Sequence, residues 1–108
     1  IIISTEKNPV VLRRAEKLEV ACLNGIEDKE STLKNYCSKN NILLSNTVFM
    51  GNDTNDLSVM ESVGFPIAVA DCHIDLQQDN FIVTQKNGGY GAVREVCDKL
   101  YSDISNQL

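Results

Sequence analysis

The stretch TVFMGNDTND, residues 47–56, decides the fold class. Its first part, Thr47–Met50, is mostly apolar and rich in β-branched and aromatic residues, which predicts a short strand. Gly51 then lets the backbone turn sharply, and oxygen-bearing side chains follow at Asn52, Asp53 and Asp56. A buried strand, a polar turn and a following helix indicate a parallel α/β sheet with a ligand site at the carboxyl end of the strand.

The same alternation of strand and helix runs along the whole chain. Further strands are predicted at Ile1–Ile3, Val20–Leu23, Pro66–Ala70 and Phe81–Thr84, the last at an edge of the sheet. Helices are predicted from Pro9 after an Asn8 N-cap, over Lys29–Lys39 after an Asp28 N-cap, from Thr54 to about Val63, and over Ala92–Ser102. Gly64 is expected directly after the third of these helices. We therefore expect one domain over residues 1–108, with a Rossmann-like parallel sheet covered by helices on both faces.

Composition excludes several classes of protein. The formal net charge of −5 argues against a nucleic-acid partner, which requires a basic surface. No apolar run approaches the ~18–20 residues of a membrane span, and no signal peptide is visible, so we expect a cytoplasmic protein without a membrane partner. The four cysteines form no Cys-x-x-Cys pair and there is one histidine, so a zinc site is not expected and the thiols are interpreted as free.

The polar turn after residue 51 carries a candidate metal site. Asn52, Asp53 and Asp56 offer the hard oxygen ligands that Mg²⁺ prefers, together with water and a substrate phosphate. The alternative interpretation is that Asp53 and Thr54 only cap the next helix. Capping accounts for one acidic residue here and leaves the second, with two asparagines beside it, without an explanation.

Two residues after other strands are candidate phosphate ligands. Ser4 follows the first strand, where its hydroxyl and the adjacent backbone N–H groups could bind phosphate oxygens, although a polar turn is the simpler interpretation. Lys29 opens a helix, where its charge opposes the helix dipole, and a phosphate bound there would remove the conflict. A solvated surface lysine is the alternative.

A glycine-rich segment near the end of the chain is a third candidate. Gly88–Gly91 could be flexible and could bring Arg94 toward an anionic ligand, although its pattern is not a nucleotide-binding fingerprint. His73 could act as a general acid or base, but without an identifiable partner it is interpreted as structural.

In this order, these residues resemble the haloacid dehalogenase superfamily of phosphatases. The closer likeness is to the 3-deoxy-D-manno-octulosonate 8-phosphate phosphatase-like family, which includes the phosphatase-like C-terminal modules of N-acylneuraminate (sialic acid) cytidylyltransferases. The likeness extends from Ile1 to about Leu100. The segments that carry it are Ile2–Glu6, Asp28-Lys29, Val48–Leu57, Val63–Asp71 and Gly88–Glu95.

The resemblance implies a Mg²⁺-dependent hydrolase of phosphomonoesters, acting on an acidic sugar phosphate. It implies that Ser4, with Thr5 beside it, and Lys29 contact the phosphate, and that Asn52, Asp53 and Asp56 form the metal motif. It also implies that the segment with Arg94 helps to close the site, often that of a neighbouring subunit in a homotetramer.

Two departures from the family pattern matter. The family has Asp at the position of Asn52, so a neutral amide replaces a charged metal ligand. The first motif, an Asp-x-Asp after the first strand, supplies the nucleophile, and no Asp-x-Asp occurs among the 108 residues. We therefore expect a domain that lacks its first, central strand. Its site would bind the phosphate and the metal but would lack the nucleophilic carboxylate.

Two functions from different classes follow. The first is a sugar-acid phosphatase, inactive as this isolated chain. The alternative is a non-catalytic module that assembles a cytidylyltransferase, in which case a nucleotidyltransferase domain would be fused to it. A receiver-like phosphate-binding domain is a weaker third reading, because receivers place their acidic cluster early in the chain.

Overall fold

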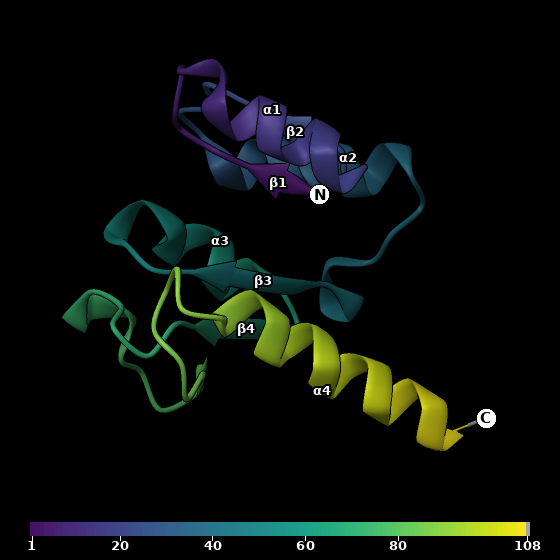
Figure 1. Ribbon diagram of the computed structural model, residues 1–108, viewed down its shortest axis with the longest axis vertical. Coiled ribbons are helices and arrows are strands. Elements are labelled where there is room, and N and C mark those ends of the chain that lie inside the picture. Colours follow the sequence, from purple (N-terminus) through teal and green to yellow (C-terminus); the bar gives the residue numbers. More distant parts are fainter. Residues whose placement is uncertain (108) are drawn as a thin grey trace. The chain divides into compact units, whose positions relative to one another are not determined.

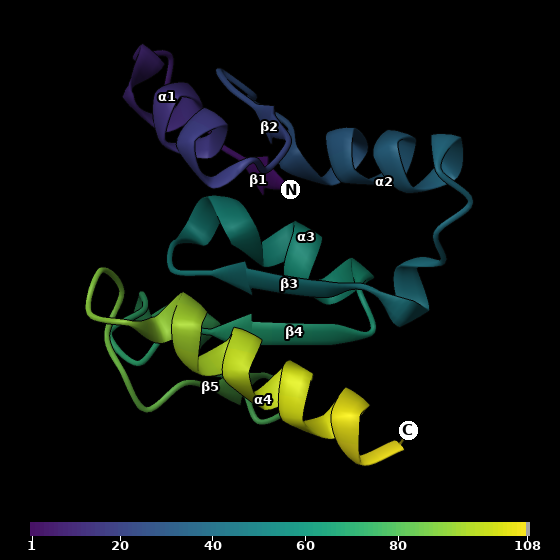
Figure 2. The same cartoon turned by 45° about the vertical axis from the view of Figure 1, so that its right-hand side comes forward.

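The computed structural model describes residues 1–107, and the chain divides into two compact units, residues 1–43 and residues 44 onward. Figures 1 and 2 show the ribbon coloured along the sequence. Each unit contains its own sheet, of two strands in the first unit and three in the second. The two units are described in turn.

The first unit is a small parallel strand–helix repeat. It consists of β1 (Ile2–Ile3), α1 (Pro9–Leu18), β2 (Cys22–Leu23) and α2 (Lys29–Lys39). The strands β1 and β2 pair in parallel, with Ile2 beside Cys22. Both predicted N-caps are confirmed, because Asn8 Oδ1 accepts the Val10 N–H at 3.0 Å and Asp28 Oδ1 accepts the Ser31 N–H at 3.1 Å.

The cap of α2 gives this helix a pH-dependent contribution to stability. Hydrogen bonds from the Ser31 backbone N–H and then from its hydroxyl, which lies 2.8 Å from Asp28 Oδ2, hold the pKa of Asp28 below its ordinary value. A lowered pKa means that folding favours the charged carboxylate. The contribution is therefore complete above the ordinary pKa and is lost as the pH falls through the folded value.

This linkage predicts that Asp28→Asn reduces the acid sensitivity of the first unit. The amide can still accept the Ser31 N–H but cannot titrate, so the stability difference between wild type and variant should shrink between about pH 6 and about pH 3. Urea unfolding of both proteins across this range measures it. A difference that grows toward acid pH would contradict the assigned role.

The second unit carries a three-stranded parallel sheet in the order β3-β4-β5. Its elements are η1 (Leu44–Asn46), β3 (Val48–Gly51), η2 (Thr54–Asp56), α3 (Leu57–Ser62), β4 (Phe65–Ala68), η3 (Ile74–Leu76), β5 (Ile82–Val83) and α4 (Ala92–Gln107). The strand β5 lies at an edge, as predicted.

Helices cover both faces of this sheet, which confirms the predicted fold class. A Cβ built on Gly51 would point into Met60 of α3, so this face of β3 packs on α3. Val48 and Ile67 line an apolar cavity of about 460 Å³ together with Val96 of α4. Figure 2 shows α3 and α4 on the two sides of the strands.

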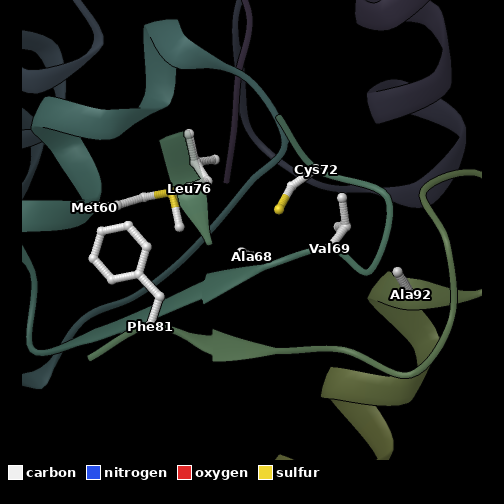
Figure 3. Packing of buried hydrophobic residues seen from close by; sticks show 7 residues of the cluster. All are labelled: Met60, Ala68, Val69, Cys72, Leu76, Phe81 and Ala92. Atoms are coloured by element: carbon white, nitrogen blue, oxygen red, sulfur yellow. The ribbon is translucent and has the colours of Figure 1, made fainter. Parts of the chain in front are cut away.

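The core of the second unit lies between the sheet, α3 and the loops that follow β4. It contains Met60, Ala68, Val69, Cys72, Leu76, Phe81 and Ala92. The largest side chains that are fully buried are Met60, Leu76 and Val59. Figure 3 shows the Met60 side chain reaching toward Leu76 and the Phe81 ring. This core holds the carboxyl ends of β3 and β4 in place.

Beyond the bounds of the strands, three details differ from the sequence prediction. The helix expected from Thr54 begins as a 3-10 turn, η2, before α3, because Asp56 folds back on the turn before it. Helix α4 continues to Gln107 rather than ending at Ser102. Gly64 follows the end of α3, as predicted, but its φ is not positive. Glycine is needed there because a Cβ would clash with the Ser45 carbonyl.

Within residues 1–107 no helix is both long enough and apolar enough to cross a membrane.

Candidate phosphate and metal site

The polar turn follows β3 at a point of close packing. A Cβ on Gly51 would lie 2.6 Å from Asp56 Cβ and 2.8 Å from Met60 Sδ, so only glycine fits there. The Gly51 carbonyl accepts the Val69 N–H at 3.2 Å, which ties the end of β3 to the residue that follows β4. The position of the turn is therefore fixed by the sheet and by α3.

Asp56 holds the turn together from within. Its side chain is buried, with 3% of the residue exposed, and Oδ2 accepts the N–H groups of Asn52 at 3.0 Å and Asp53 at 3.4 Å. With Asp53 it forms a capping box at the start of η2. The buried carboxylate is thus directed at the backbone of the turn.

The other two residues of the predicted metal motif are exposed. Asp53 Oδ1 accepts the Thr54 N–H at 2.7 Å, so the capping role proposed for Asp53 is real. Asn52 lines a cavity of about 170 Å³ whose other walls come from Met50, Gly51, Val69, Gly88 and Val93. The cavity opens at the carboxyl ends of β3 and β4, where α/β folds bind small ligands.

The donor chemistry of this turn fits a hard cation. Asn52 and Asp53 present an amide oxygen and a carboxylate on its exposed side, which suits Mg²⁺ when water and a phosphate complete the shell. In the part of the chain that the structure describes, no group of three or more His, Cys, Asp or Glu side chains could hold a metal. Among the described residues, this turn therefore offers few charged oxygen donors.

The turn after β4 contains Asp71, to which the sequence analysis gave no role, and His73, which it considered as a general acid or base. Asp71 Oδ1 accepts the Gly88 N–H at 2.8 Å, and the His73 N–H donates to the Asn52 carbonyl at 2.9 Å. His73 itself caps η3, because its Nδ1 accepts the Asp75 N–H at 3.1 Å. The Asp75 carboxylate lies 3.7 Å from the same Nδ1, so the described contacts of this side chain are with η3.

The glycine-rich segment is tied to α4 through Glu95 rather than Arg94. The Glu95 carboxylate accepts the N–H groups of Gln85 and Lys86, each at 2.9 Å. Arg94 is on the exposed side of α4, with 81% of its side chain accessible, and pairs with Asp98 at 2.9 Å. The structure thus leaves Arg94 accessible to solvent and to ligands.

The predicted phosphate ligands Ser4, Thr5 and Lys29 belong to the first unit. Ser4 follows β1, and its Oγ accepts the Glu6 N–H at 3.1 Å. Lys29 is the first residue of α2 and is half-buried. After β2, the Asn24 amide oxygen is buried without a hydrogen-bond partner among the described residues. Polar side chains thus follow both strands of this unit at the ends where a ligand site is expected.

Comparison with known proteins identifies the family. The model of the haloacid dehalogenase-like hydrolases matches residues 15–96. The chain belongs to this family. It is 39% identical over 100 residues to the 3-deoxy-D-manno-octulosonate 8-phosphate phosphatase KdsC of Escherichia coli K12, an alignment that covers 92% of the chain and 53% of that protein. The chain therefore spans about half the length of the curated relatives it matches.

Solved structures give the same result. The phosphatase of the same name from Yersinia pestis has a TM-score of 0.85 at 34% identity, over 90% of this chain and 53% of that one. The enzyme from Moraxella catarrhalis, solved with a magnesium ion, a phosphate ion and KDO, has a TM-score of 0.82 at 29% identity, over 100% and 68%. The predicted family and fold are confirmed, and the link to cytidylyltransferases stays a prediction.

Proposed function

We propose that this chain contributes the phosphate- and metal-binding part of a phosphatase that acts on an acidic sugar phosphate. The observation that carries the proposal is the turn from Gly51 to Asp56. A buried Asp56 fixes its backbone, and Asn52 and Asp53 are left exposed beside a cavity at the carboxyl ends of β3 and β4. The likeness to phosphatases of octulosonate 8-phosphate supports the substrate class.

In this proposal the residues of the chain have distinct roles. Asn52 and Asp53 are the direct ligands of Mg²⁺, and Asp56 holds them in position. Bound Mg²⁺ supplies positive charge beside the phosphate. Ser4, Thr5 and Lys29 bind the phosphate oxygens by hydrogen bonds and charge, and Arg94 binds an anionic group of the substrate. Phosphoryl transfer depends mainly on such positioning and on positive charge around the phosphate oxygens.

The nucleophile is proposed to come from residues outside these 108. In the second unit β3 pairs only with β4 among the described strands, and in the first unit β1 pairs only with β2. The strands β1 and β3 therefore each have an edge that can accept a further strand. The family has a strand carrying Asp-x-Asp at the centre of its sheet, and we propose that such a strand supplies the nucleophile. We further propose, from the family resemblance, that the whole protein is a homo-oligomer. The 108-residue chain by itself should also associate through these uncovered edges.

The metal part of the proposal is tested by titrating the chain with MgCl₂ and following the backbone amide signals by NMR. We expect shifts at Asn52 and Asp53, and binding that is roughly tenfold tighter in Asn52→Asp, because a carboxylate replaces a neutral ligand.

Asn55→Asp is the matched control, since it adds the same charge to the same exposed turn at a position that is not a proposed ligand. We expect it to change the affinity by no more than about twofold. Equal tightening in both variants would show only a general electrostatic effect, and an absence of shifts at the turn would reject the metal site.

The isolated 108-residue chain is expected to have no phosphatase activity, because it contains no Asp-x-Asp to attack the phosphorus. Hydrolysis of p-nitrophenyl phosphate with Mg²⁺, compared with buffer alone, measures this. Robust turnover that disappears in Asp53→Ala would show that the chain supplies its own nucleophile and would overturn the proposal.

A second candidate function is a non-catalytic assembly module of an N-acylneuraminate cytidylyltransferase. The neutral Asn52 at a metal position favours it, because an amide oxygen binds Mg²⁺ less strongly than a carboxylate. The MgCl₂ titration separates the two functions, since a module that only assembles subunits has no reason to bind the metal at this turn.

A further inference from the structure

The turn after β4 bridges two loops that are distant in sequence. On one side, the His73 N–H donates to the Asn52 carbonyl at 2.9 Å, which ties this turn to the proposed metal ligand. On the other side, Asp71 Oδ1 accepts the Gly88 N–H at 2.8 Å, across a separation of 17 residues. The turn itself is closed by the Cys72 N–H, which donates to the Val69 carbonyl at 3.0 Å. The three loops at this end of the sheet are therefore hydrogen-bonded in series.

The chain just before the glycine-rich loop is also held, so Asp71 adds a second attachment at the first glycine. The buried Thr84 hydroxyl accepts the Ala70 N–H at 3.0 Å and donates to the Lys86 carbonyl at 2.7 Å. Glu95 accepts the N–H groups of Gln85 and Lys86. The chain is therefore held at residues 85–86 and again at Gly88, so the start of the glycine-rich loop is fixed beside the cavity, in contrast to the flexible segment expected from its glycines.

Gly88 is the point at which this loop meets the cavity beside Asn52. The cavity of about 170 Å³ is lined by both residues and by Val69. A Cβ on Gly88 would lie 3.6 Å from Asp71 Oδ1 and 3.8 Å from Val69 Cγ2, which are ordinary contacts. Space therefore does not require glycine here, and the feature that fixes Gly88 is its N–H bond to Asp71.

We propose that Asp71 is a positioning residue of the site. By accepting the Gly88 N–H, it holds the glycine-rich loop as the wall of the cavity opposite the metal turn, so that a small polar ligand beside Asn52 meets a preformed surface. The inference rests on the proposed function only for the identity of the cavity's ligand. The hydrogen bond and the attachment of the loop are independent of it.

Amide hydrogen exchange of the 108-residue chain tests the attachment. Asp71→Ala should accelerate exchange at Gly88 about tenfold or more, as expected for loss of a hydrogen bond to a charged acceptor, and should leave the β4 amides unchanged. Asp71→Asn keeps an acceptor and should stay within about threefold of wild type. Asp75→Ala, which removes another exposed carboxylate nearby, is the control. Unchanged exchange at Gly88 in Asp71→Ala, or equal acceleration in β4, would overturn the proposal.

The MgCl₂ titration separates this proposal from the proposed function. In wild type we expect Mg²⁺ to shift the amide signals of Asn52 and Gly88 together, and in Asp71→Ala to shift only Asn52, with Asp71→Asn restoring both. Shifts at Asn52 without any at Gly88 in wild type would reject the positioning role while the metal site stands. An absence of shifts at both residues rejects the metal site, and the exchange experiment then decides the role of Asp71.

Discussion

Gly64→Ala is expected to destabilise the second unit by about 3 kcal/mol or more, which is a large part of the stability of a small domain. A Cβ at this position would overlap the Ser45 carbonyl oxygen and lie 2.6 Å from the carbonyl carbon. Both atoms belong to the backbone, so no side chain can rotate to relieve the clash. The Gly64 N–H also donates to the Leu44 carbonyl at 2.9 Å, and a shift of the chain would break that bond as well.

Urea unfolding of the chain measures this loss, and Gly88→Ala is the matched control. The control adds the same methyl group where its nearest neighbours lie 3.6 Å and 3.8 Å away, so we expect a change within about 0.5 kcal/mol. If the two variants were equally stable, the close approach of Ser45 to Gly64 could not be a property of the folded protein.

The features of the fold that the sequence predicts best are those decided within a few residues. The bounds of α2, Lys29–Lys39, agree with the prediction because Asp28 caps its first turn through local hydrogen bonds. Pro9 at the first position of α1, after the Asn8 cap, is a further example. Both depend on spacings of two or three residues, which the sequence displays directly.

Contacts between distant segments could not be predicted in the same way. Asp71 and Gly88 are 17 residues apart, and neither has a local pattern that indicates their hydrogen bond. In the pair Arg94-Glu95, charge made the arginine the candidate for an anionic ligand. The structure shows instead that Glu95 contacts the glycine-rich loop, because its position on α4 faces the N–H groups of Gln85 and Lys86.

The role of Asp56 is a more instructive case, because the sequence identified the residue and not its environment. Composition alone gives Asp53 and Asp56 equal standing as metal ligands. Their exposure separates them, since Asp53 is exposed and Asp56 is 3% exposed beneath Gly51. Burial of this kind depends on β3, η2 and α3 packing together, and no single segment of the sequence displays it. We therefore propose Asp53 and Asn52 as the ligands and Asp56 as the residue that orients them.

Asp56→Ala should accordingly destabilise the second unit by roughly 2–4 kcal/mol in the absence of any metal. The substitution removes the acceptor for the Asn52 and Asp53 N–H groups and leaves these donors partly buried. Asp53→Ala removes only an exposed cap and should cost about 1 kcal/mol. Urea unfolding with EDTA present measures both variants.

The sign of the Asp56→Ala effect separates the two possible roles of this carboxylate. A buried carboxylate kept only to bind a cation is unfavourable in the metal-free protein, so its removal would leave stability unchanged or raise it. A carboxylate that binds the backbone of the turn stabilises the protein with or without metal, and its removal lowers stability in both conditions. Loss of stability in EDTA, together with disordered amide signals at Asn52 and Asp53, is the result we expect, because the same two hydrogen bonds fold the turn and aim its ligands.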